Sequence, residues 1–123
     1  MKRVAWVGLV AISVAISLFF EWHTDEVTVV LAAMSLLALL VGAACPKWAV
    51  VGGAIIGFSI TIAHALSESF GVVRPHYGHS APSTGDWVAM ALAGVFVTGV
   101  AWVGGRVRRM MENRPAAARE NIR

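Results

Sequence analysis

The sequence predicts an all-α polytopic membrane protein with four transmembrane helices in an antiparallel bundle. Hydrophobic residues make up 58% of the chain and charged residues 14%, whereas about a quarter of the residues in soluble domains are charged. Asp, Glu, Lys and Arg are absent from four runs of 17 to 20 residues, at 4–20, 27–46, 48–67 and 87–105. A helix of about 20 residues rises ~30 Å, the thickness of the hydrocarbon core of a bilayer. The strict alternation of membrane β-strands is missing.

The first predicted helix, about residues 4–20, raises the question of a cleaved signal peptide. The segment "MKRVAWVGLVAISVAIS" has a basic start, an apolar run and a small-x-small ending at Ala15 and Ser17, which are features of secretory signals. Bulky residues follow at once: Leu18, Phe19, Phe20 and Trp22. We therefore expect the first helix to stay uncleaved.

The second and third helices, about 27–46 and 48–67, are joined by little more than Pro46 and Lys47. Because proline is tolerated in a first helical turn and disfavours helix in the residue before it, a tight antiparallel hairpin is predicted. The first two helices are joined by "EWHTDE", where Thr24 is a candidate cap of the second helix. Cys45 is the only cysteine, so an intrachain disulfide is excluded.

The fourth helix, about 87–105, closes a predicted transmembrane domain of residues 1–105. The loop before it, residues 68–86, is too short to bury a core of its own. Residues 106–123 form a basic tail, which we expect to be disordered beyond Asn113. In this tail Arg106, Arg108 and Arg109 are predicted to contact anionic lipid headgroups.

The distribution of basic residues predicts the orientation. In a four-span topology, nine of the ten Lys and Arg residues lie on one side of the membrane and only Arg74 lies on the other. The positive-inside rule then places both termini in the cytoplasm. Tryptophans fall near the expected helix ends, as interfacial anchors do, at positions 6, 22, 48, 87 and 102.

Small residues predict where the helices pack, because close approach drives helix association in lipid. On the third helix, Gly53 and Gly57 share a stripe with His64, and on the fourth helix Gly94 and Thr98 belong to a comparable stripe. We expect a bundle with the third helix at its centre. His64 is then expected to face protein rather than lipid.

A polar cluster on the outer side is the main candidate site. His64 and Glu68 are spaced i,i+4, and His76 and His79 follow in the loop. Zinc takes imidazole nitrogens and carboxylate oxygens, usually four in a tetrahedron. Residues His64, Glu68, His76 and His79 therefore form a candidate zinc site, with His23 or Asp25 as alternative ligands.

Two other interpretations of the cluster remain open. His64 lies about one turn inside the outer end of its helix, where it can donate to a backbone carbonyl or a Ser or Thr of a neighbouring helix. The cluster is also compatible with pH sensing, since histidine titrates near pH ~6.5. His64 is the only titratable side chain within a predicted span apart from Cys45.

The segment "CPKWAVVGGAIIGFSITIAHAL" resembles part of a group of small, uncharacterised four-span bacterial membrane proteins. In that group a Pro-basic-Trp turn opens a Gly-containing helix that ends in His near the opposite surface. The resemblance covers the second and third helices and implies a bacterial inner-membrane location. Small multidrug transporters carry a Glu within the first helix, and fluoride channels carry a charged Arg in a Gly-rich motif; the predicted spans have neither feature.

These observations predict a structural or accessory membrane protein that contacts the lipid bilayer and either another membrane protein or itself. A metal-handling protein and a small pore or holin-like oligomer are the alternatives. We expect no enzyme, because a nucleophile elbow, an HExxH motif and paired carboxylates are missing. The sequence pI of about 9.8 is explained by topology, so nucleic acid is not an expected partner.

Overall fold

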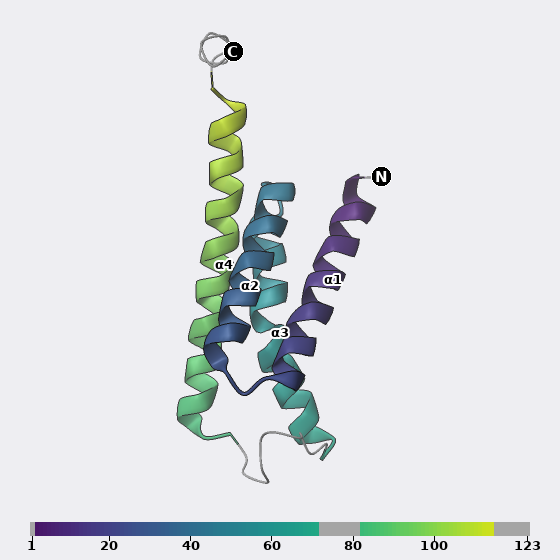
Figure 1. Cartoon of the computed structure of the whole chain (residues 1–123), viewed down its shortest axis with the longest axis vertical. Coiled ribbons are helices and arrows are strands. Elements are labelled where there is room, and N and C mark those ends of the chain that lie inside the picture. The colour runs from purple at the N-terminus through teal and green to yellow at the C-terminus, as the bar shows by residue number, and fades with distance from the viewer. Residues whose placement is uncertain (1, 72–81, 115–123) are drawn as a thin grey trace.

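Four helices run in alternating directions through the computed structural model, which describes residues 2–71 and 82–114 (Figure 1). They are α1 (Lys2–His23), α2 (Val27–Ala44), α3 (Ala49–Ser69) and α4 (Thr84–Glu112). All four are long and apolar enough to cross a membrane. The predicted fold class is confirmed. His76, His79 and the tail residues 115–123 lie outside the described residues.

The helix ends differ from the predicted spans because a charge-free run marks the apolar part of a helix and not its ends. α1 continues beyond residue 20 to His23, so that Glu21 is helical. α4 has 29 residues, or roughly 43 Å, and its last turns extend beyond the ends of the other helices (Figure 1). The first part of the predicted tail, from Arg106 to Glu112, is therefore helix.

The caps follow the local sequence at α4 but not at α2. At the start of α4, the Ser83 hydroxyl accepts from the Asp86 N–H, and the Asp86 carboxylate accepts from the Ser83 N–H at 2.7 Å. This reciprocal capping box satisfies two N–H groups that the helix itself leaves unpaired. The prediction that Thr24 caps α2 is wrong: the N-cap is Glu26, without a side-chain cap, and Thr24 Oγ1 accepts from the Glu26 N–H within the turn.

The α3–α4 interface is built on backbone contact. A Cβ atom added at Gly57 would lie 2.6 Å from the carbonyl oxygen of Gly94, and one added at Gly53 would lie 3.0 Å from the Cα of Thr98. Any side chain larger than hydrogen at these two positions would push the helices apart. The four residues predicted to pack helices, Gly53, Gly57, Gly94 and Thr98, thus lie together where α3 meets α4.

α2 joins the same tightly packed unit. A Cβ atom at Gly104 would lie 2.5 Å from the carbonyl oxygen of Leu39, and one at Gly42 would clash with the backbone of Ala101. The side chains that fill the centre are fully buried: Ala38, Val41, Ile56, Val97 and Ala101. Helices α2, α3 and α4 therefore form a unit in which all three pairs are in contact.

α1 packs on the opposite side of α2 and α3 and, within the described residues, does not touch α4. Its buried residues are few: Val10, Ser13 and Ser17. Near the N-terminus the Trp6 ring lies 5.8 Å from the Trp48 ring and covers Gly52. The predicted central position of the third helix agrees with its contacts, and α2 shares this position, because α2 and α3 both contact all the other helices.

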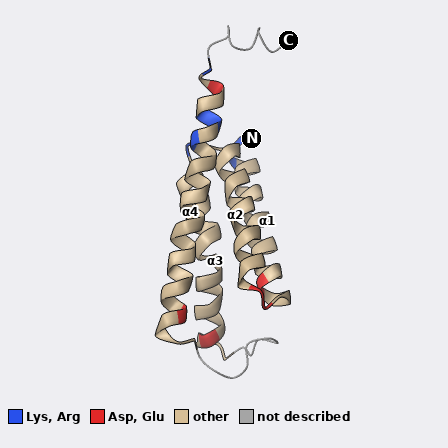
Figure 2. Cartoon of the chain, turned by 60° about the vertical axis from the view of Figure 1, so that its left-hand side comes forward, with Lys and Arg blue, Asp and Glu red and all other residues tan. Residues whose placement is uncertain are grey.

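Charge separates along the axis of the bundle (Figure 2). The described acidic residues gather at the end that holds the α1–α2 turn, apart from Glu112 near the end of α4. The described basic residues lie at the opposite end: Lys2, Arg3, Lys47, Arg106, Arg108, Arg109 and Arg114. We call these the acidic end and the basic end.

Substitution of Gly57 by Ala tests the close approach of α3 and α4. The added methyl meets the Gly94 backbone, which cannot move without shifting a helix, so we expect Gly57→Ala to lower the free energy of unfolding by about 1–3 kcal/mol. Unfolding in mixed dodecyl maltoside and SDS micelles measures the change. Gly8→Ala is the matched control, because a Cβ there meets nothing within 4 Å; an equal loss in both variants would contradict the interface.

Candidate functional site

The site begins with a stripe of polar residues on α1. Ser13, Ser17 and Glu21 are spaced i,i+4, so they lie above one another on one face of the helix. Both serine side chains are buried, and each hydroxyl donates to the carbonyl four residues earlier: Ser13 to Leu9 and Ser17 to Ser13, at 2.8 Å each. The hydroxyls are thus satisfied within α1, and these small buried side chains let this face of α1 pack closely against the bundle.

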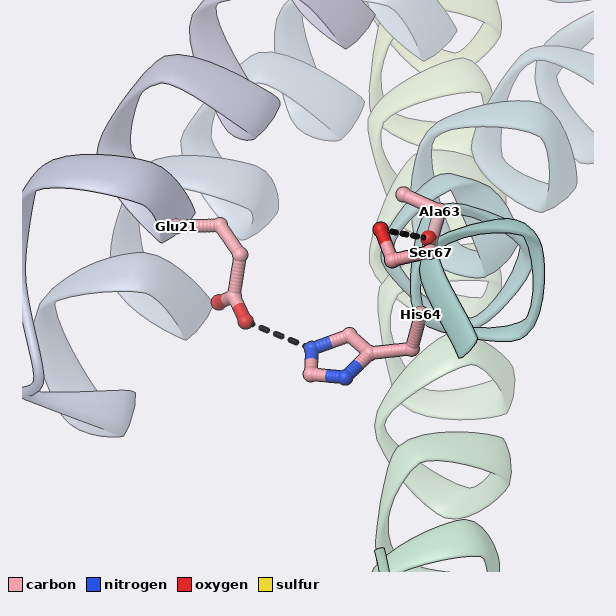
Figure 3. A network of polar contacts seen from close by, with 4 residues as sticks. All are labelled: Glu21, Ala63, His64 and Ser67. Atoms are coloured by element: carbon pink, nitrogen blue, oxygen red, sulfur yellow. Dashed lines mark hydrogen bonds and ion pairs between the residues drawn. The ribbon is translucent and has the colours of Figure 1, made fainter. Parts of the chain in front are cut away.

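Glu21, the next residue of the stripe, meets His64 of α3. The Nε2–H of His64 donates to Oε1 of Glu21 at 2.7 Å, and the side chains are only 9% and 10% exposed (Figure 3). Hydrogen bonds to an ionised carboxylate are short and about twice as strong as neutral ones. An isolated carboxylate is costly to remove from water, so Glu21 can be buried here because the imidazole is its partner.

The surroundings place this pair near the acidic end rather than in the middle of the bundle. Glu21 is two residues from the last residue of α1 and His64 is five residues from the last residue of α3, which is less than two helical turns. Ser67, one turn beyond His64, donates to the carbonyl of Ala63 at 2.8 Å (Figure 3). The pair therefore sits just inside one end of the spans.

Of the four predicted zinc ligands, the structure describes His64 and Glu68. His64 turns to Glu21, whereas Glu68 is exposed at the end of α3. The alternative ligand His23 donates through Nδ1 to the carbonyl of Phe19 at 2.9 Å and stacks on the Phe19 ring, and Asp25 is exposed. Within residues 2–71 and 82–114, no three His, Cys, Asp or Glu side chains are grouped to hold a metal ion.

Two expectations about His64 need correction. Its Nε2 atom bonds a carboxylate, which is a partner that we did not predict. It is also not the only titratable group of a span besides Cys45, because Glu21 belongs to α1. The burial of His64 is confirmed. The i,i+4 spacing of Ser13, Ser17 and Glu21 is the sequence feature that indicates a buried Glu21. It extends the polar stripe of α1 beyond residue 20, where the charge-free run ends.

The three arginines predicted to bind lipid headgroups make three different contacts. Arg106 lies over the Trp102 ring, with its Cζ atom 5.0 Å from the ring centroid. Arg108 donates through Nε to Glu112 at 2.7 Å, and Arg109 donates through Nη2 to the carbonyl of Pro46 at 2.9 Å. They therefore do not form one equivalent set.

Comparison of the chain with protein-family models, curated proteins and solved structures gives no match. The resemblance of residues 45–66 to small four-span bacterial membrane proteins therefore stays an expectation.

Loss of either member of the Glu21–His64 pair should destabilise the bundle. Glu21→Ala leaves an imidazole buried without its carboxylate, and we expect a loss of about 3 kcal/mol in the free energy of unfolding. Glu68→Ala removes an exposed carboxylate one turn from His64 and should change that free energy by less than about 0.5 kcal/mol. Unfolding in mixed micelles measures both.

A double variant separates pairing from packing. Because apolar residues of similar size can replace a buried hydrogen-bonded pair at little cost, Glu21→Leu/His64→Leu should recover most of the stability that either single leucine substitution loses. If the loss of unfolding free energy in the double variant equals the sum of the losses in the two single variants, Glu21 and His64 are not coupled, and the result would contradict the pair.

Proposed function

We propose that the chain is a structural or accessory protein of the membrane, whose bundle associates side by side with another membrane protein or with a second copy of itself. Its four transmembrane helices imply a bilayer setting. The observation that carries the proposal is the outer face of α4, on the side away from α2 and α3.

This outer face consists of large apolar side chains around one open glycine. Leu92, Phe96 and Val103 are all exposed, and they surround Gly99 at helical spacing. A Cβ atom at Gly99 would meet nothing within 4 Å, whereas Gly94, Gly104 and Gly105 all lie against other helices. A small residue among large ones allows the backbone of another transmembrane helix to approach closely.

The proposed location is the bacterial inner membrane, with both termini in the cytoplasm. Support comes from the separation of charge, since the basic end carries both described chain ends, Lys2 and Arg114, and basic segments favour the cytoplasmic side. The resemblance of residues 45–66 supports the bacterial origin.

Cysteine cross-linking in membranes tests the proposed association. In a Cys45→Ala background, Gly99→Cys should give a cross-linked product, either a dimer of the chain or a complex with a second protein. Gly8→Cys is the matched control, because Gly8 is the open glycine of α1. Absence of any Gly99 product, or equal products at both positions, would contradict the proposal. A ladder of higher oligomers at Gly99 would favour the pore-like alternative.

The metal-handling alternative is supported by the Glu21–His64 contact, because it places an imidazole beside a carboxylate. Zinc prefers these ligands but usually takes four. If this alternative holds, purified protein in detergent binds zinc with micromolar or tighter affinity, and His64→Ala/His76→Ala/His79→Ala abolishes the binding. Equal binding by both proteins in a zinc titration would eliminate it.

A further inference from the structure

We propose that the basic end holds the phosphate group of an anionic phospholipid between Arg106 and Arg109 of α4 and Lys47 in the turn between α2 and α3. This inference is independent of the association proposed for the outer face of α4. It also assigns Arg106 and Arg109, but not Arg108, to the lipid phosphate, whereas the sequence analysis treats the three arginines alike. We call the three residues Lys47, Arg106 and Arg109 the phosphate site.

The first argument is the spacing of residues on α4. Trp102, Arg106 and Arg109 are separated by four and three residues, so they share one flank of the helix. The Arg106 guanidinium lies over the Trp102 indole, 5.0 Å from the ring centroid, which is within cation–π distance. Trp102 and Arg106 are both exposed, so this flank is open to the lipid at the basic end.

The second argument is the turn that packs against this flank. Arg109 Nη2 donates to the carbonyl of Pro46 at 2.9 Å, and a Cβ atom at Gly105 would lie 3.3 Å from the Pro46 Cα. Lys47 follows Pro46 in the chain and is exposed. The backbone of the turn next to Lys47 is thus held against the part of α4 that carries Arg109. The contact uses one of the five N–H donors of Arg109, so others can bind a ligand.

The third argument is that Arg108 differs from its neighbours. It donates to Glu112 at 2.7 Å, and the two side chains are 52% and 55% exposed. This i,i+4 pair compensates the charge of Arg108 on its own helix. Glu112 is the only acid at the basic end in the part of the chain that the structure describes. Among the three arginines at 106, 108 and 109, the positive charge that no acid on α4 compensates therefore belongs to Arg106 and Arg109.

The ligand chemistry follows from these contacts. Guanidinium groups bind phosphate oxygens through two parallel hydrogen bonds, and lysine adds a point charge. An indole ring prefers the membrane interface, where the glycerol region of a lipid lies. A phosphodiester with a net negative charge, as in phosphatidylglycerol, fits this combination. Phosphatidylcholine carries a compensating cation and should bind less well.

Native mass spectrometry of the purified chain in detergent tests the site, with phosphatidylglycerol, phosphatidylcholine and inorganic phosphate as the probes. We expect Arg106→Gln/Arg109→Gln to weaken phosphatidylglycerol binding about 30-fold. Arg108→Gln/Arg114→Gln also removes two positive charges from the basic end and should weaken it less than about threefold. Phosphatidylcholine binding should change little in either variant.

The remaining outcomes overturn the proposal. Equal weakening by Arg108→Gln/Arg114→Gln would show general charge attraction rather than a site, and inorganic phosphate bound as tightly as the lipid would show a free anion as the ligand. If Arg106→Gln/Arg109→Gln fails to fold, Lys47→Gln/Arg106→Gln replaces it, because neither residue makes the Pro46 contact. Unchanged phosphatidylglycerol binding in that variant would also overturn the site.

Discussion

An apolar helix gains little hydrophobic free energy when it leaves lipid for another apolar helix, and this constraint governs the whole bundle. Close packing and polar contacts must supply the association instead. In α2, α3 and α4 the solution is glycine: Gly42, Gly57 and Gly104 bring backbone against backbone, at distances that no larger residue allows. These three helices form the rigid part of the molecule.

α1 is held by a different solution. Within the described residues it contacts α2 and α3 but not α4, and it buries few side chains. Aromatic rings fix it at the basic end, where Trp6 meets Trp48, and the Glu21–His64 hydrogen bond fixes it near the acidic end. Because both side chains are at most 10% exposed, its loss leaves a buried polar group without this partner. Within the described residues, the bond is therefore a polar link between α1 and the rigid part.

The sequence predicts the number of helices and their mutual contacts better than it predicts the site. Charge-free runs reveal the apolar part of each span, and the stripe of Gly53 and Gly57 reveals the face that meets α4. The charge-free run ends before Glu21, so the sequence predicts that Glu21 lies in a loop. In the structure Glu21 belongs to α1, because His64 of α3 is a partner that allows its carboxylate to be buried. The i,i+4 spacing of Arg108 and Glu112 is visible in the sequence, whereas the contact of Arg109 with Pro46 is not, because Pro46 is distant in the sequence.

The central claim is that Glu21 and His64 hold α1 against a rigid unit of α2, α3 and α4. The most direct test is the distance distribution between spin labels in bilayers, in a Cys45→Ala background, with cysteines at the exposed positions Ile16, Ile62 and Leu92. The account predicts that Glu21→Ala broadens the α1–α3 distribution measured between positions 16 and 62. The α3–α4 distribution between positions 62 and 92 should stay narrow. An α1–α3 distribution that is unchanged by Glu21→Ala would contradict the account.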